Sequence, residues 1–218
     1  MVSKEHFKDN LITDSCIIDN VHELFVSVYL SYCMDLEKSL GIRKNKISYN
    51  YLLIEASVLY KIIDRINDSV LGIRPITMLD MLLFKEALIY IGKGQKDRKD
   101  SHLKEAFKLL IGKLDEALIT EKHTRIVNAW MHGEGIVVLQ FLNDSDSFLS
   151  LCRESAMIKS AGDNLSNVRN GSAYGSMKNK WTNTEILNFG EMLLYFSLKQ
   201  CILERPSPIF QDNLEKHY

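Results

Sequence analysis

The stretch from residue 165 to residue 175 reads Leu-Ser-Asn-Val-Arg-Asn-Gly-Ser-Ala-Tyr-Gly, and the prediction of the fold depends on it. Val168 ends an apolar lead-in, Arg169 and Asn170 follow it, and two glycines punctuate the remainder. Arginine suits a phosphate because its planar guanidinium donates two parallel hydrogen bonds and does not lose its charge. The stretch therefore marks Arg169 as a candidate anion-binding residue in front of a strongly helical segment.

This stretch resembles the signature of the HEPN superfamily, in which an apolar residue precedes Arg-Asn and a histidine follows after about four to six residues. Tyr174 stands in the place of the histidine, whereas the other residues fit the pattern: Val168, Arg169, Asn170, Ala173 and Gly175. The resemblance implies a bundle of helices with the motif near the start of its last long helix. It also implies a homodimer in which two copies of the motif face each other.

The resemblance further implies a function on RNA, since many HEPN domains are metal-independent ribonucleases and others only bind. In that chemistry Arg169 and Asn170 belong to the catalytic site, and the histidine moves a proton of the ribose 2′-hydroxyl or of the leaving group. Tyr174 is a poor base near neutral pH because the pKa of a phenol is about 10, although it can donate a hydrogen bond or stack on a base. The sequence leaves open whether the protein is an enzyme.

We therefore expect an RNA-binding protein or a metal-independent endoribonuclease in a defence, CRISPR-associated or toxin–antitoxin setting. The alternative is a catalytically silent helical module that binds a protein partner or regulates one. The substitution at Tyr174 favours binding over cleavage.

A second arginine–histidine pair lies upstream, where Arg125 and His132 stand seven positions apart and Gly133 follows. Residues seven apart on a helix lie on nearly one face, so both side chains could reach one phosphate. His132 would then supply the proton transfer that Tyr174 lacks, if the fold brings the two together. The alternative is a partly buried histidine that caps a helix end.

Lys178, Lys180 and Trp181 follow the stretch closely and add two positive charges and an aromatic ring beside Arg169. Lysines attract phosphates and aromatic rings stack on bases, so these residues are typical of an RNA-contacting patch. Two lysines in a polar loop are also ordinary, and Trp181 could equally be buried. The predicted RNA-binding residues are Arg125, Arg169, Lys178, Lys180 and Trp181.

The composition is that of a soluble globular domain, with 46% hydrophobic and 25% charged residues in a chain of 218. The net charge is −1, so any phosphate-binding surface must be a local patch. We expect a cytoplasmic protein with no membrane span, because no signal-peptide pattern and no long apolar run occur. The cysteines are far apart in sequence and are interpreted as reduced thiols: Cys16, Cys33, Cys152 and Cys201.

No cofactor or metal is expected from the motifs. His102 and His123 stand without a cysteine, aspartate or glutamate at a familiar ligand spacing, and no P-loop or dinucleotide fingerprint occurs. The charged segment 92–100 could touch phosphates, but a solvated connector is the simpler interpretation.

Helical periodicity and the scarcity of proline predict an all-α protein. The apolar run 136–142 is typical of a buried helix or a strand, and we expect a helix because no neighbouring segment offers a strand partner. The chain is therefore predicted to form a single helical domain over 1–205, an HEPN-like bundle of about six to eight helices, with a polar tail over 206–218. The predicted helices span 17–40, 48–71, 77–91, 101–118, 121–142, 144–158 and 184–204.

Overall fold

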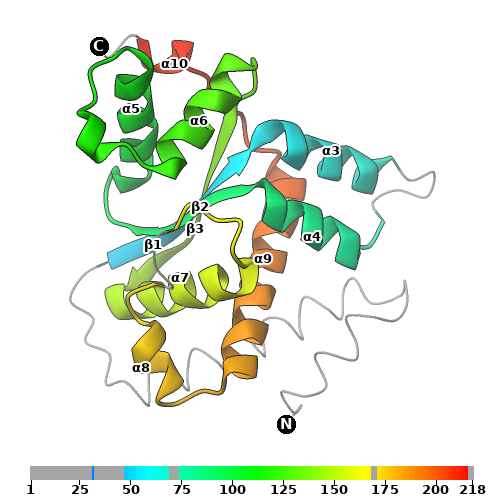
Figure 1. Ribbon diagram of the computed structural model, residues 1–218. Helices are drawn as coiled ribbons and strands as arrows, with labels where there is room; N and C mark the ends of the chain where they lie inside the picture. The colour runs from blue at the N-terminus through cyan, green and yellow to red at the C-terminus, as the bar shows by residue number, and fades with distance from the viewer. Residues whose placement is uncertain (1–30, 32–46, 69–73, 168–170, 216–218) are drawn as a thin grey trace.

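The computed structural model describes residues 31, 47–68, 74–167 and 171–215 (Figure 1). These residues contain a three-stranded antiparallel sheet in the order β2-β1-β3. Its strands are β1 (Ile47–Glu55), β2 (Leu88–Gly94) and β3 (Ile136–Asp146). The prediction of an all-α bundle is therefore wrong, because three of the apolar segments interpreted as helices contain strands.

Helices cover both faces of this sheet. Figure 1 shows α5 and α6 above the sheet and α7 and α9 below it, with α3 and α4 beside the lower layer. The helices are α3 (Ala56–Asn67), α4 (Met78–Ala87), α5 (Arg98–Leu110), η1 (Glu116–Leu118), α6 (Glu121–Met131), α7 (Ser147–Ala161), α8 (Tyr174–Lys178), α9 (Asn183–Glu204) and α10 (Asp212–Glu215).

The central strand β1 is buried on both faces. Tyr49, Tyr51 and Leu53 pack under α5 and α6, whereas Leu52 and Ile54 pack against the helices of the other face. A strand buried on both sides reads as a continuous apolar run, which periodicity cannot distinguish from a buried helix. For this reason the predicted helix over 48–71 is wrong across β1 and right only from α3 onward.

The predicted helix over 77–91 also divides into a helix and a strand. Thr77 caps α4 through a capping box with Asp80, but the backbone becomes extended at Leu88 and continues as β2. Gly92 pairs with Tyr51 across the two strands, and a Cβ at Gly92 would collide with the Tyr51 ring. The glycine is therefore required for the tyrosine ring to lie over β2.

The third misassigned segment is 136–142. The chain leaves α6 through Gly133, whose φ is +72°, and enters β3, which pairs with β1 along its length. The expectation of a helix failed because its premise was wrong: β1 is the strand partner that the flanking sequence did not reveal.

The last long helix follows the prediction. Thr182 and Glu185 form a capping box at the start of α9, which ends at Glu204. A Cβ at Gly190 would collide with the carbonyl of Ala156, so α7 and α9 can approach closely only because Gly190 has no side chain. Beyond Pro206, Ile209 forms a backbone bridge with Ile136, and Leu214 is buried.

Several predictions concern residues outside the described part. The predicted helix over 17–40 falls there almost entirely, and so do Arg169 and Asn170. Cys152 and Cys201 are buried free thiols, as expected for reduced cysteines. None of the helices in the described ranges is both long and apolar enough to cross a membrane.

Candidate functional site

A cavity of about 300 Å³ lies beside the outer strand β2. Four different elements contribute polar side chains to it: β2, α6, α7 and the loop after α7. These side chains include Tyr90, Lys122, Glu154 and Asn167, and three hydroxyl side chains also line the cavity: Thr120, Ser166 and Ser172. Because they are far apart in sequence, only the tertiary fold brings them together.

The loop after α7 is fixed to β2 by backbone hydrogen bonds. Asn167 Oδ1 accepts the N–H of Ile91 at 3.0 Å, and Asn167 Nδ2 donates to the carbonyl of the same residue at 2.8 Å. The N–H of Ser166 donates to the carbonyl of Ile89 at 2.9 Å. One wall of the cavity is therefore held rigidly against the strand.

Glu154 brings a carboxylate of unusual character to the cavity. Its Oε1 accepts the backbone N–H of Lys93 at 3.0 Å. Among the described residues, no lysine, arginine or histidine nitrogen forms an ion pair with this carboxylate. Burial raises the pKa of Glu154 to about 7, and the nearby Lys93 opposes that rise only in part. The carboxyl group thus lies in a polar cavity with its charge largely uncompensated.

A buried chain of hydrogen bonds leads toward the same cavity. Lys122 Nζ lies 2.8 Å from His102 Nδ1, and His102 Nε2 lies 2.7 Å from Tyr51 Oη. Burial, followed by the charge of Lys122, lowers the pKa of His102 to about 4, so its imidazole is neutral at pH 7. An ammonium group only donates, so Nδ1 accepts from Lys122 and Nε2–H donates to Tyr51.

Tyr90 lies next to this chain. Burial raises the pKa of both Tyr51 and Tyr90, so both phenols stay protonated near neutral pH. The Tyr90 ring lies beside that of Tyr51, with the ring centres 6.0 Å apart, and the nearby Tyr51 hydroxyl lowers the pKa of Tyr90 against the larger effect of burial. Tyr90 therefore presents a protonated hydroxyl at the cavity wall.

Arg98, the first residue of α5, adds an exposed cation close to this chain. Its positive charge lowers the pKa of Tyr51 and of Tyr90, against the larger effect of burial. The charged segment 92–100, interpreted from the sequence as a solvated connector, thus includes the end of β2 and the start of α5. Its Arg98 places a positive charge near Tyr51 and Tyr90.

Two further polar residues, Glu105 and His123, lie close to His102. Glu105 Oε2 is 3.5 Å from His102 Nδ1 and 3.0 Å from His123 Nε2. The two histidines, which seemed isolated in the sequence, thus share one carboxylate across α5 and α6.

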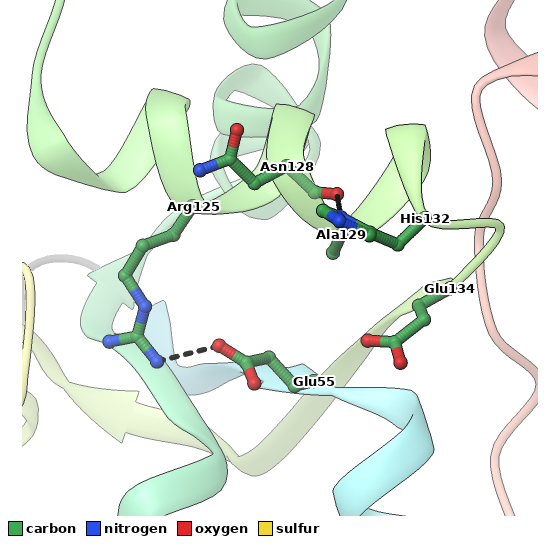
Figure 2. Close-up of a pocket in the computed structure, with 6 residues that line it drawn as sticks. All are labelled: Glu55, Arg125, Asn128, Ala129, His132 and Glu134. Carbon is green, nitrogen blue, oxygen red and sulfur yellow. Dashed lines mark hydrogen bonds and ion pairs between the residues drawn. The ribbon is translucent and has the colours of Figure 1, made fainter.

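A second cavity, of about 250 Å³, lies between the end of β1 and α6 (Figure 2). Arg125 Nη2 lies 2.7 Å from Glu55 Oε1, and Arg125 Nη1 donates to the carbonyl of Asn164 at 2.8 Å. His132 Nδ1 bonds the carbonyl of Asn128 at 2.7 Å at the end of α6. The structure therefore brings Arg125 and His132 to one cavity, where both make intramolecular bonds.

The residues predicted near Arg169 lie elsewhere. Tyr174 and Lys178 belong to α8, which packs on α7 on the opposite side of the sheet from α6. His132 therefore does not meet Tyr174. Trp181 is buried, with its ring edge-on to Phe189 at 5.3 Å, and Lys180 is exposed. Contact of these residues with RNA stays a prediction.

The sequence analysis missed Tyr51, Tyr90, Lys122, Glu154 and Asn167. One signal was available: Tyr49 and Tyr51 alternate on one apolar run, and Gly92 and Gly94 alternate on another. Paired strands with that alternation place each ring over a glycine. No comparable signal marks Glu154, because its burial depends on how α7 packs.

Comparison with known proteins places this geometry in a family. The family model described as the LEM-3-like GIY-YIG domain matches residues 48–216. The chain is 31% identical over 140 residues to the ankyrin repeat and LEM domain-containing protein 1 homolog of Caenorhabditis elegans, covering 62% of this chain and 19% of that protein. It is 30% identical over 139 residues to ankyrin repeat and LEM domain-containing protein 1 of Mus musculus, covering 62% of this chain and 24% of that protein.

The chain thus spans only about a fifth to a quarter of the length of these curated relatives. No solved structure matches. The family match overturns the resemblance to the HEPN superfamily, and with it the prediction of an HEPN-like protein acting on RNA. The sheet agrees with the match, since Tyr90-Ile91-Gly92 on β2 is the second tripeptide of the family's name and its Gly92 pairs with Tyr51 on β1. The chain belongs to the family of LEM-3-like GIY-YIG domains.

Proposed function

We propose that this chain is a divalent-metal-dependent nuclease domain that hydrolyses phosphodiester bonds at the cavity beside β2. One observation carries the proposal: the partly buried Glu154 carboxylate and the Tyr90 hydroxyl line the same cavity, and no ion pair neutralises the carboxylate among the described residues. Buried charges without a partner are rare outside functional sites.

The residues present fit a hard divalent cation such as Mg²⁺. Mg²⁺ binds through one or two carboxylates and completes its shell with water and phosphate oxygens, so Glu154 can supply its protein ligand. A cation there would offset the burial that raises the Glu154 pKa. When bound, such an ion lowers the pKa of its water and neutralises charge on the phosphate.

The side chains around Glu154 have distinct roles in this proposal. The exposed guanidinium of Arg98 attracts and orients the phosphate. Tyr90 donates a hydrogen bond to a phosphate oxygen, because burial keeps its phenol protonated at the cavity wall. Asn167 positions the loop that closes the cavity.

The experiment compares cleavage of DNA and RNA by the purified chain in Mg²⁺ and in EDTA. Attack by water needs no 2′-hydroxyl, so DNA and RNA are both tested, as single strands, duplexes and branched junctions. We expect cleavage that requires Mg²⁺ and disappears in Glu154→Gln. The matched control is Glu55→Gln, which alters a carboxylate of the second cavity. Cleavage that survives EDTA or the Glu154 substitution would exclude the proposal.

Other expectations from the sequence stay predictions: a homodimer, RNA or a protein as partner, and a cytoplasmic location. The ankyrin repeats and LEM domains in the names of the relatives belong to those longer proteins.

A further inference from the structure

We propose that His102, Glu105 and His123 form a second metal site, selective for a divalent transition-metal ion such as Zn²⁺, that joins α5 to α6. This site does not include Glu154, but it shares His102 with the hydrogen-bond chain that leads to the cavity beside β2. Its three ligands come from two helices that pack on the same face of the sheet.

The ligand atoms already have a suitable spacing. Glu105 Oε2 lies 3.5 Å from His102 Nδ1 and 3.0 Å from His123 Nε2, and the three atoms all lie within 4.8 Å of one another. Ligands about 2.0–2.2 Å from a tetrahedral zinc ion are separated by roughly 3.3 Å. A water molecule can complete the fourth position, since the Glu105 side chain is 41% exposed.

Each imidazole also has an oxygen partner for its other nitrogen. His102 Nε2 lies 2.7 Å from Tyr51 Oη, and His123 Nδ1 lies 3.1 Å from Thr120 Oγ1. Metal-bound histidines almost always donate their second N–H to an oxygen, which fixes the ring. His102 already has that arrangement. His123 Nδ1 now accepts the backbone N–H of Thr120 at 3.3 Å, so a proton on Nδ1 would replace that bond with one donated to Thr120 Oγ1. Both rings are buried and held in place.

Lys122 is the competitor of the metal ion. Its Nζ lies 2.8 Å from His102 Nδ1, the lone pair that an ion would use. The same ammonium lies 4.7 Å from the centre of the Tyr90 ring, so it can turn toward that ring and the cavity beside β2. The ion and Lys122 therefore exclude each other at His102, while the bond from His102 to Tyr51 is unchanged.

The donor sets of the two sites select different ions. Two imidazoles and a carboxylate suit Zn²⁺ or Co²⁺, whereas a single carboxylate with water and phosphate oxygens suits Mg²⁺. A hydrogen-bonded cluster without metal affinity is the alternative explanation of the same contacts.

The test uses the full chain after EDTA treatment and removal of the chelator. Zn²⁺ binding is measured by calorimetry, Co²⁺ binding by the visible absorption of tetrahedral Co²⁺, and thermal unfolding is recorded with and without Zn²⁺. We expect one tetrahedral ion per chain and a higher Tm with Zn²⁺. Glu105→Gln and His123→Gln should each weaken the affinity by more than about tenfold, because each removes a ligand.

Glu154→Gln is the matched control and should bind Zn²⁺ as the unchanged chain does. Glu105→Gln keeps the size of the half-exposed side chain, so it tests the site even if His123→Gln fails to fold. Absence of tetrahedral Co²⁺, unchanged affinity in Glu105→Gln, or loss of Zn²⁺ binding in Glu154→Gln would each overturn the proposal. None of these measurements uses cleavage, so the result is independent of the nuclease test.

Discussion

The two cavities of this domain each contain a partly buried glutamate, but the two carboxylates have different partners. In the cavity between β1 and α6, Glu55 lies 2.7 Å from the guanidinium of Arg125. In the cavity beside β2, Glu154 accepts a backbone N–H, and its pKa is raised to about 7 by burial. A neutralised carboxylate supports the fold, whereas an uncompensated one can bind a cation.

Helix α6 connects the two cavities. It supplies Lys122 to the cavity beside β2 and Arg125 to the other. Arg125 also donates to the carbonyl of Asn164, close before the loop residues that bond to β2. Arg125 therefore forms the ion pair of one cavity and also supports the loop that lines the other.

Replacing each glutamate gives the largest expected difference between the cavities. Glu154→Gln should lower the cleavage rate by about a thousandfold or more, because the amide cannot hold the metal ion. Glu55→Gln should leave the rate within about threefold, since Arg125 keeps a hydrogen-bond acceptor. Single-turnover cleavage of a labelled DNA substrate in Mg²⁺ measures both, and equal losses would erase the distinction between the cavities.

Removing one hydroxyl tests the donor assigned to the cavity beside β2. Tyr90→Phe keeps the ring and removes the hydroxyl donor at the cavity wall, so the rate should fall about a hundredfold with little change in substrate affinity. His132→Ala, in the other cavity, should change the rate less than about twofold. A loss in His132→Ala that equals the loss in Tyr90→Phe would contradict the assignment.

The pH dependence follows from the raised pKa of Glu154. Below about 7 the carboxyl is mostly protonated and cannot bind Mg²⁺, so at subsaturating Mg²⁺ the rate should rise about tenfold per pH unit toward 7 and then level off. Without metal, ionising this buried group destabilises the folded state as the pH rises toward 7. Mg²⁺ should therefore raise Tm more at pH 8 than at pH 6, and an equal rise at both pH values would contradict the assignment.

Breaking the ion pair of the second cavity should affect stability rather than chemistry. Arg125→Met leaves Glu55 without its partner and removes the bond to Asn164, so the free energy of unfolding should fall by about 1–3 kcal/mol. The rate of the folded protein should fall less than about tenfold. Urea unfolding measures the free energy of unfolding, and cleavage assayed at urea concentrations well below the unfolding midpoint measures the rate. A large loss of rate with unchanged stability would contradict the structural role assigned to this ion pair.

The sequence predicted those elements whose signals are local. Thr182 and Glu185 form a capping box, and one-sided apolar spacing indicates α5. The strands were missed because β1 is apolar on both faces and α3 begins at the next residue, so the two together resemble one long helix. Strand pairing joins segments that are distant in the sequence, so no local pattern indicates it.

The site was missed for the same reason. Glu154 is one polar residue on α7, and its raised pKa depends on burial against β2. Lys122 belongs to an amphipathic helix in which a lysine is ordinary, yet the fold buries its ammonium beside His102. The Arg-Asn stretch attracted attention because its signal is local, and its central residues 168–170 lie outside the described ranges.

The amide of Asn167 has a consequence for how this domain behaves among other chains. An edge strand with free N–H and C=O groups is a template for strand addition and aggregation. The Asn167 amide bonds both the N–H and the carbonyl of Ile91. The N–H of Ser166 donates to the carbonyl of Ile89, and the Glu154 carboxylate accepts the N–H of Lys93. These contacts act as a substitute for a fourth strand. Strand β2 is therefore protected from pairing with a strand of another domain or of a second copy of this chain.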